Sequence, residues 1–330
     1  MKYRNLGFSG LKVSEISLGS WISFNDSGNI DVPRAIINKA FDCGINLFDT
    51  SNTYHTGNAE SILGEVLSEH PRESYVISTK VFFPTGSGPN ERGLSRKHIF
   101  SQVHKSLKRL KTDYIDIYFC HWYDNQTPIE ESLRAMNDLV CQGNILYYGV
   151  SNWTAAQISD GLRTVDKFNL YPISVNQPSY NILDRYIENE TLPLCSKNGI
   201  GQIVYSPLAQ GVLTGKYSLL KDYPTDSRAK NPLAKGAVSI FDYLNPETLT
   251  TVNKIAELAE SLKISLTELS LAWVLENSTI SSAIIGASKP EQIEQNVKAS
   301  GLSLSEDTLT AIDKILSESN HVIKHNIEPW

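Results

Sequence analysis

Short apolar runs that end in a polar residue or a glycine recur along the chain, and a segment with helical spacing of apolar residues follows most of them. The runs have the length of buried strands and are too short for helices. We expect strands at residues 16–21, 47–49, 75–80, 115–120, 145–151, 173–177, 202–206 and 283–286. Strands that alternate with helices without interruption are typical of a parallel sheet covered by helices.

The segments between the runs carry apolar residues three and four positions apart, which predicts amphipathic helices. These positions fall within residues 36–41, 62–67, 99–110, 155–165, 187–196, 252–262, 266–275 and 309–316. Asn58 is a candidate cap of the second helix. Residues 127–130 have the pattern of a capping box with a proline at the first helical position, and Gly143 stands where that helix would end.

The alternation predicts a single (β/α)8 TIM barrel that spans residues 1–330, with an N-terminal β-hairpin and extra C-terminal helices. With 330 residues, 41% of them hydrophobic, the chain can bury about three quarters of its unfolded surface. Residues 2–13 carry glycines between two short strand-like runs and would form a hairpin that plugs the bottom of the barrel. Residues 211–242 are the long irregular stretch, and loops of this length are usually functional or disordered.

Composition and charge exclude several classes of partner. The net charge of −6 is spread along the chain, without a basic block that would bind nucleic acid or an anionic membrane. The sequence has no apolar run of about 18 residues and no apolar signal segment, so we expect a cytoplasmic protein. The four cysteines lack CxxC spacing and the histidines lack metal-ligand spacing, which predicts reduced thiols and no metal site.

Residues with acid–base chemistry stand at the ends of three successive runs. Asp49 ends one run, Lys80 ends the next and His121 follows the third, while Tyr54 comes five residues after Asp49. In a barrel of parallel strands the carboxyl ends meet at one face, where active sites are built. We therefore expect these four side chains to converge. Taken singly, each has an ordinary interpretation: a cap, a surface lysine, a core histidine or a loop tyrosine.

Asn46 to Tyr54 followed by Gly57, together with Lys80, His121 and residues 149–152, resembles the aldo-keto reductases, and the resemblance covers nearly the whole chain. It implies NADP(H)-dependent reduction of an aldehyde or ketone, with Tyr54 as the proton donor. Lys80 would bring the pKa of Tyr54 down toward working pH, and Asp49 would hold Lys80 charged. His121 would donate a hydrogen bond to the substrate oxygen or assist proton transfer.

The same resemblance implies a set of cofactor contacts. Ser151, Asn152 and Gln177 match residues that hold the nicotinamide carboxamide, and Tyr205 matches an aromatic residue that stacks on its ring. Without the resemblance, Ser151 and Asn152 are equally well a helix cap and Tyr205 a core residue. The other matches to cofactor-binding positions are Gly19, Ser20, Trp21, Ser206, Leu208, Gln210, Lys216, Arg228, Gly286, Ser288, Lys289, Gln292, Gln295 and Asn296.

Residues 288–292 are predicted to start a helix, with a serine cap and an early proline, and such a start favours an anion. With Lys216 and Arg228 this segment resembles the pocket for the 2′-phosphate of NADPH. Gln292 and Asn296 match adenine contacts, whereas Gln295 stands where many relatives carry glutamate. The glycines at residues 86–88 do not have the spacing of a dinucleotide-binding loop.

Aromatic residues fall on loops at the same face of the predicted barrel. They would form an apolar wall for a small carbonyl substrate, and the alternative is that they only pack the barrel. These residues are Trp21, Tyr54, Phe82, Trp122 and Tyr123.

The chain also resembles the β subunits of voltage-gated potassium channels in residues 46–50, 84–95 and 206–209. A cofactor-sensing regulatory protein with little turnover is therefore the alternative function. In those subunits an asparagine commonly takes the place of His121, so the imidazole favours the enzyme. Bacterial small-aldehyde reductases share the pattern of residues 176–181. The sequence leaves open the physiological substrate, the direction of the reaction and the oligomeric state, a homo-oligomer included.

Overall fold

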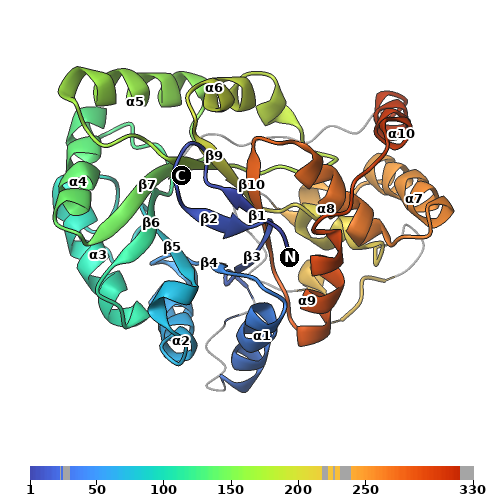
Figure 1. Ribbon diagram of the computed structural model, residues 1–330, viewed down its shortest axis with the longest axis horizontal. Helices are drawn as coiled ribbons and strands as arrows, with labels where there is room; N and C mark the ends of the chain where they lie inside the picture. Colours follow the sequence, from blue (N-terminus) through green and yellow to red (C-terminus); the bar gives the residue numbers. More distant parts are fainter. Residues whose placement is uncertain (23, 25–29, 218–221, 226, 231–238, 320–330) are drawn as a thin grey trace.

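The computed structural model describes residues 1–22, 24, 30–217, 222–225, 227–230 and 239–319. Its centre is a closed barrel of parallel strands in the order β10-β3-β4-β5-β6-β7-β8-β9, surrounded by helices (Figure 1). The predicted (β/α)8 barrel is thus confirmed. The barrel strands are β3 (Ile16–Gly19), β4 (Leu47–Asp49), β5 (Val76–Val81), β6 (Ile115–Cys120), β7 (Ile145–Ser151), β8 (Val175–Gln177), β9 (Gly201–Val204) and β10 (Ile280–Ile285).

The predicted N-terminal hairpin is also present. Strands β1 (Tyr3–Asn5) and β2 (Lys12–Ser14) pair antiparallel, and the hairpin lies across one end of the barrel (Figure 1). Leu6, which follows β1, and Val13 of β2 pack against apolar side chains that point into the barrel. At Gly7, with a φ of +56°, an added Cβ would lie 2.1 Å from the backbone oxygen of Gly199, two residues before β9. Only a glycine lets the plug approach so closely.

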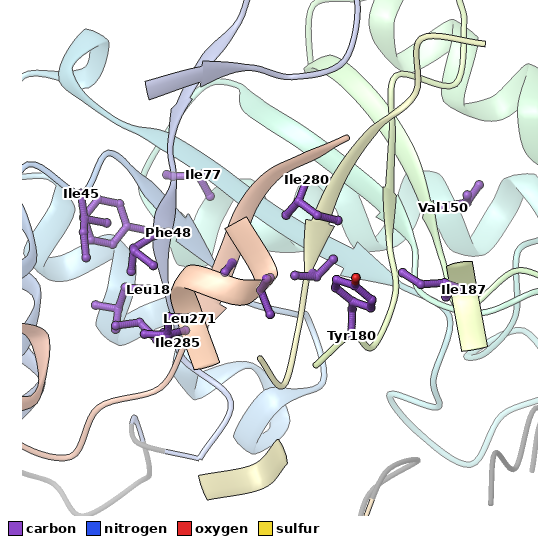
Figure 2. Close-up of a cluster of buried hydrophobic side chains, with 14 of the residues drawn as sticks. Leu18, Ile45, Phe48, Ile77, Val150, Tyr180, Ile187, Leu271, Ile280 and Ile285 are labelled. Atoms are coloured by element: carbon purple, nitrogen blue, oxygen red, sulfur yellow. The ribbon is translucent and has the colours of Figure 1, made fainter. Parts of the chain in front are cut away.

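Alternate residues of the barrel strands face outward and pack under the helices, because successive side chains of a strand point to opposite faces. Figure 2 shows Leu18 of β3 beside Ile285 of β10, its partner in the strand register, and Leu271 of α8 packed on both. The helices are α1 (Asp31–Asp42), α2 (Asn58–Leu67), α3 (Arg96–Leu110), α4 (Ile129–Cys141), α5 (Ala155–Phe168), α6 (Thr191–Lys197), α7 (Pro246–Ser261), α8 (Leu266–Glu276), α9 (Pro290–Asn296) and α10 (Glu306–Ser317).

Among the helices predicted before residue 200, three details are wrong. The helix expected at 187–196 is divided into a 3-10 turn, Tyr186–Glu188, and α6. Pro193 accounts for the later start, since proline is tolerated only in the first turn. Asn58 is not a cap: Gly57 precedes α2 with a φ of +93°, and Asn58 is already helical.

The capping box at residues 127–130 is the third error. The hydroxyl of Thr127 donates to Asp124 instead, at 2.7 Å, and Pro128 precedes α4 without a side-chain cap. The end of that helix is as predicted, because Gly143 follows it with a φ of +73°. Of the irregular stretch 211–242, the described residues contain only short 3-10 turns, at Ala209–Thr214, Arg228–Lys230 and Ile240–Asp242.

Candidate active site

The polar residues at the strand ends share the inward orientation of the side chains that line the barrel. Asp49 follows the inward Leu47 by two positions, and His121 follows the inward Phe119 by two positions. Side chains two positions apart in a strand lie on the same face. The pattern that fills the barrel with apolar groups therefore also places a carboxylate and an imidazole over its carboxyl end.

Asp49 and Lys80 form a buried ion pair at this end. The Nζ of Lys80, a side chain 1% exposed, lies 2.6 Å from Oδ1 of Asp49 and 2.7 Å from the backbone oxygen of Thr50. Oδ2 of Asp49 accepts hydrogen bonds from Ser78 at 2.6 Å and from Gln177 at 2.9 Å. Burial lowers the pKa of Lys80, and the carboxylate of Asp49 opposes that shift. The pair is held in one geometry because its oxygens and its ammonium are hydrogen-bonded.

The ring of Tyr54 lies over this pair, with its centroid 5.1 Å from the Nζ of Lys80. Burial raises the pKa of the Tyr54 phenol well above its usual value, and the charge of Asp49 raises it further. The shift is therefore opposite in direction to the one expected from Lys80, and burial is its largest cause. A phenol with a raised pKa stays protonated at neutral pH and can still protonate an alkoxide, which is a stronger base than a phenolate.

The loop that carries Tyr54 has an unusual backbone. The three residues that follow Tyr54 all have left-handed φ values, of 48°, 55° and 93°, and such positions cost about 1–3 kcal/mol each for residues other than glycine. Arg109 of α3 fastens this loop: its Nε donates to buried Glu60 at 2.6 Å and lies 2.9 Å from the Cβ position of Gly57. The ion pair between Arg109 and Glu60 therefore holds in place the tight loop that carries Tyr54.

His121 is enclosed by aromatic rings. Its ring centroid lies 5.9 Å from that of Tyr54 and 4.9 Å from that of Phe83, edge to face in both cases. Burial, and then the charge of Lys80, hold the pKa of His121 well below its usual value, so the imidazole is neutral at pH 7. Its Nδ1 lies 3.3 Å from Oγ of Ser51.

The residues expected at the nicotinamide lie together beside this centre. The hydroxyl of Ser151 donates to the backbone oxygen of Gln177 at 2.8 Å, and the hydroxyl of Tyr205 donates to Oδ1 of Asn152 at 2.8 Å. The alternative that Ser151 and Asn152 cap a helix is wrong. Thr154 is the cap of α5, in a capping box.

The segment expected at the phosphates contains a partly buried cation, Arg228. A guanidinium nitrogen of Arg228 donates to the side-chain oxygen of Gln210, whose amide donates in turn to Ser206 at 2.7 Å. The guanidinium carbon of Arg228 lies 5.6 Å from the ring centroid of Trp21. Burial lowers the pKa of Arg228, and among the described residues no carboxylate forms an ion pair with it. A mostly buried cation of this kind is suited to an anionic ligand.

The remaining predicted cofactor positions occupy the rim of the same face. Gly19 ends β3 and Ser20 follows it, Leu208 is half-buried, and Gly286 directly follows β10 with its Cβ position 3.8 Å from a nitrogen of Arg228. The Nζ of Lys216 lies 5.4 Å from the ring centroid of Tyr217.

The helix start after β10 differs from its prediction. Lys289, not Ser288, is the residue before α9, and it offers no side-chain cap. Ser288 instead donates its backbone N–H to the side chain of Gln292 at 2.7 Å. Pro290 is at the first helical position, as expected. Asn296 is buried, and Gln295 is exposed.

Residues 15–317 match the model of the Aldo/keto reductase family. The chain belongs to the aldo/keto reductase family. It is 41% identical over 304 residues, 91% of each chain, to a probable voltage-gated potassium channel subunit beta of Oryza sativa subsp. japonica. It is 42% identical over 304 residues, again 91% of each chain, to a probable voltage-gated potassium channel subunit beta of Arabidopsis thaliana. A putative voltage-gated potassium channel subunit beta of Schizosaccharomyces pombe is 40% identical over 322 residues, 96% of this chain and 93% of that protein.

This membership supports an oxidoreductase that uses a nicotinamide cofactor. In the aldo/keto reductase barrel described above, Asp49, Tyr54, Lys80 and His121 do converge at the carboxyl end. Among the described residues, which exclude His321 and His325, no group of three or more His, Cys, Asp or Glu side chains is placed to hold a metal ion. Nor do those residues contain a helix with the length and hydrophobicity needed to cross a membrane.

Phe83 is an aromatic neighbour of the site that was not among the predicted residues of this aldo/keto reductase. Phe83 meets His121, whereas Phe82 is buried in the outer core with its ring centroid 5.3 Å from that of Phe83. The ring centroid of Trp122 lies 6.2 Å from that of Phe83. The ring centroid of Trp21 lies 6.4 Å from that of Tyr54.

Other missed residues had a signal in the sequence. Ser78 stands two positions before Lys80 and therefore on the same inward face, where it bonds Asp49. Ser51 follows the same strand as Asp49 and contacts His121. The predicted Tyr123 lies farther along its loop, where its ring meets Trp153 edge to face at 5.0 Å.

Proposed function

We propose that the protein reduces aldehydes or ketones to alcohols with NADPH, and that Tyr54 is the proton donor. The observation that carries the proposal is the placement of a neutral phenol and a neutral imidazole with ring centroids 5.9 Å apart over a buried ion pair. When bound, the nicotinamide would supply the hydride to the carbonyl carbon. Tyr54 would give its proton to the carbonyl oxygen as negative charge develops there.

The neighbours of Tyr54 act electrostatically in this proposal. His121, kept neutral by burial and by Lys80, would donate a hydrogen bond to the same oxygen. Such preorganised donors stabilise developing charge in a site that excludes water. Lys80 stabilises the phenolate that remains after proton transfer, and Asp49 fixes its position. Phe83 and Trp21 would bound the space for an apolar substrate body.

The residues present suit NADPH. Ser151, Asn152 and Gln177 offer hydroxyl and amide groups for the carboxamide, and Tyr205 offers a ring face. Arg228 is a mostly buried cation without a described carboxylate partner, which is a suitable place for a phosphate. Lys216 and the segment around Lys289 would complete the anionic pocket.

Replacement of Tyr54 by phenylalanine tests the mechanism, since it removes only the hydroxyl. NADPH binding, followed by quenching of protein fluorescence, should be unchanged. Reduction of 4-nitrobenzaldehyde or methylglyoxal should be at least about a hundredfold slower, because general acid catalysis is commonly worth 10²–10⁴ in rate. Near-full activity of Tyr54→Phe would show that another group donates the proton.

A second candidate function is that of a cofactor-sensing regulatory subunit. The relatives that carry the name of potassium channel subunit beta favour it. His121 favours the enzyme, because an imidazole can donate to a substrate oxygen and assist proton transfer. A broad panel of aldehydes and ketones separates the two functions: NADPH binding without turnover of any member would support the regulatory subunit.

A further inference from the structure

We propose that Ser51 is a positioning residue that fixes the tautomer of His121, by donating its hydroxyl proton to Nδ1 so that Nε2 carries the ring proton. The inference rests on the proposed function, because only there does His121 donate to the substrate oxygen. A neutral imidazole with its proton on Nδ1 would present a lone pair to that oxygen and repel it. The tautomer therefore decides whether His121 can act.

The position of His121 is fixed from several sides. Its backbone N–H donates to Val81 at 3.0 Å, and its backbone oxygen accepts from the side chain of Asn152 at 3.3 Å. The rings of Tyr54 and Phe83 enclose the imidazole edge to face. With the ring held in this way, the hydrogen bond at one nitrogen sets the proton on the other.

Ser51 is fully buried on the loop after β4, and its Oγ lies 3.3 Å from Nδ1 of His121. The backbone N–H of Thr53 donates to the same Oγ at 3.4 Å, so one of its lone pairs is occupied. The hydroxyl proton then has two alternatives nearby besides Nδ1: Oγ1 of Thr53 at 3.3 Å and Oδ1 of Asn52 at 3.4 Å. The imidazole nitrogen is the more basic acceptor, and this favours donation to His121.

Nitrogen-15 NMR of the histidine side chains tests the proposal without any turnover. In the unmodified protein at neutral pH, the signals of His121, assigned by their loss in His121→Gln, should show a protonated Nε2 and an unprotonated Nδ1. A protonated Nδ1 would overturn the inference. It would leave the reductase proposal to be judged by the activity of Tyr54→Phe.

Replacement of Ser51 by alanine should move His121 toward the other tautomer. We expect kcat for aldehyde reduction to fall about tenfold, as for loss of one hydrogen bond of about 1.4 kcal/mol, with NADPH affinity unchanged. Ser51→Thr keeps the hydroxyl and should restore both the spectrum and kcat. Ser68→Ala, the same change on an exposed hydroxyl that bonds the backbone of Glu65, should alter neither.

The outcomes separate this inference from the proposed function. An unchanged His121 spectrum in folded Ser51→Ala, with full kcat, would overturn the role of Ser51 while the enzyme stands. The expected tautomer shift in a protein that reduces no aldehyde or ketone would support the hydrogen bond and refute the reductase. Should Ser51→Ala fail to fold, the spectra of the unmodified protein and of Ser51→Thr decide.

Discussion

The side-chain amide of Gln177 donates a hydrogen bond of 2.9 Å to Oδ2 of Asp49, across the mouth of the barrel from β8 to β4. Gln177 is the residue expected to hold the nicotinamide carboxamide, and Asp49 is the partner of Lys80. One buried carboxylate therefore joins the proposed cofactor site to the proposed proton-donor site. A substitution in the proposed cofactor site should therefore affect the proposed proton-donor site, and the reverse should also hold.

The Asp49–Lys80 pair should show strong coupling in stability. Lys80→Met leaves a buried carboxylate without its cation and should cost about 3–5 kcal/mol in free energy of unfolding. Asp49→Asn should cost less, since an amide can keep the hydrogen bonds. The double variant should lose at least about 1 kcal/mol less than the sum of the two single losses. Urea titration of the four proteins measures this, and additive losses would contradict the pairing.

Gly57 should be irreplaceable for catalysis. Gly57→Ala forces a side chain into left-handed backbone and places its Cβ 2.9 Å from Nε of Arg109, so it should displace the Tyr54 loop and lower kcat at least tenfold. The matched control is Gly143→Ala, which also has a positive φ but no atom within 4 Å of its Cβ position. That variant should lose about 1 kcal/mol of stability and keep its kcat. Equal kcat values for the two variants would refute this account of the loop.

Phe83 should determine which substrates are accepted, whereas Phe82 should affect stability. Phe83→Ala removes the ring that meets His121, so KM for an aromatic aldehyde should rise about tenfold with little change for methylglyoxal. Phe82→Ala empties a core position and should lower the free energy of unfolding by about 3–5 kcal/mol. The KM ratio of the two substrates in each variant provides the comparison. A larger change of that ratio in Phe82→Ala would reverse the assignment.

The fold was predictable from the sequence because the barrel follows one rule throughout. The two-residue alternation that makes Leu47 inward also makes Asp49 inward, so the chemistry at the strand ends follows from the same pattern as the core. That rule stops where the strand stops. Beyond Val81 the chain leaves β5, so alternation no longer orders Phe82 and Phe83, and the contact of Phe83 with His121 was not predictable from it.

The pKa of Tyr54 was mispredicted for a different reason. Sequence places Lys80 near the phenol but does not give the competition between a cation, its carboxylate partner and burial. The capping errors are of the same kind: Thr127 has the right side chain for a cap, but Asp124 takes its hydroxyl. These outcomes depend on tertiary neighbours that a local pattern does not contain.

The stability of the protein should fall in mild acid through His121. Its pKa lies near 6.5 in the unfolded chain and well below that value in the folded protein, so the unfolded state takes up the proton first. The stabilisation is complete above pH 6.5 and is lost as the pH falls toward the folded pKa, by as much as about 1.4 kcal/mol per pH unit. The variant His121→Asn lacks this contribution. His98, whose pKa is also lowered, is present in both the variant and the unmodified protein, so its effect cancels in the comparison. The difference in unfolding free energy between the unmodified protein and His121→Asn should therefore shrink from pH 7 to pH 5, and a constant difference would contradict the burial of a neutral imidazole.

Arg228 should set the preference for NADPH over NADH. Its guanidinium is mostly buried, bonded to Gln210 and near Trp21, so a phosphate placed there would gain a charge-assisted hydrogen bond worth about 1.5–3 kcal/mol. Arg228→Ala should weaken NADPH binding roughly tenfold to a hundredfold and leave NADH affinity nearly unchanged. Lys230→Ala removes the same charge from an exposed position of the same turn and should leave both affinities unchanged. Fluorescence titration with the two cofactors gives the four constants, and equal affinities of the unmodified protein for NADPH and NADH would rule out a phosphate pocket at Arg228.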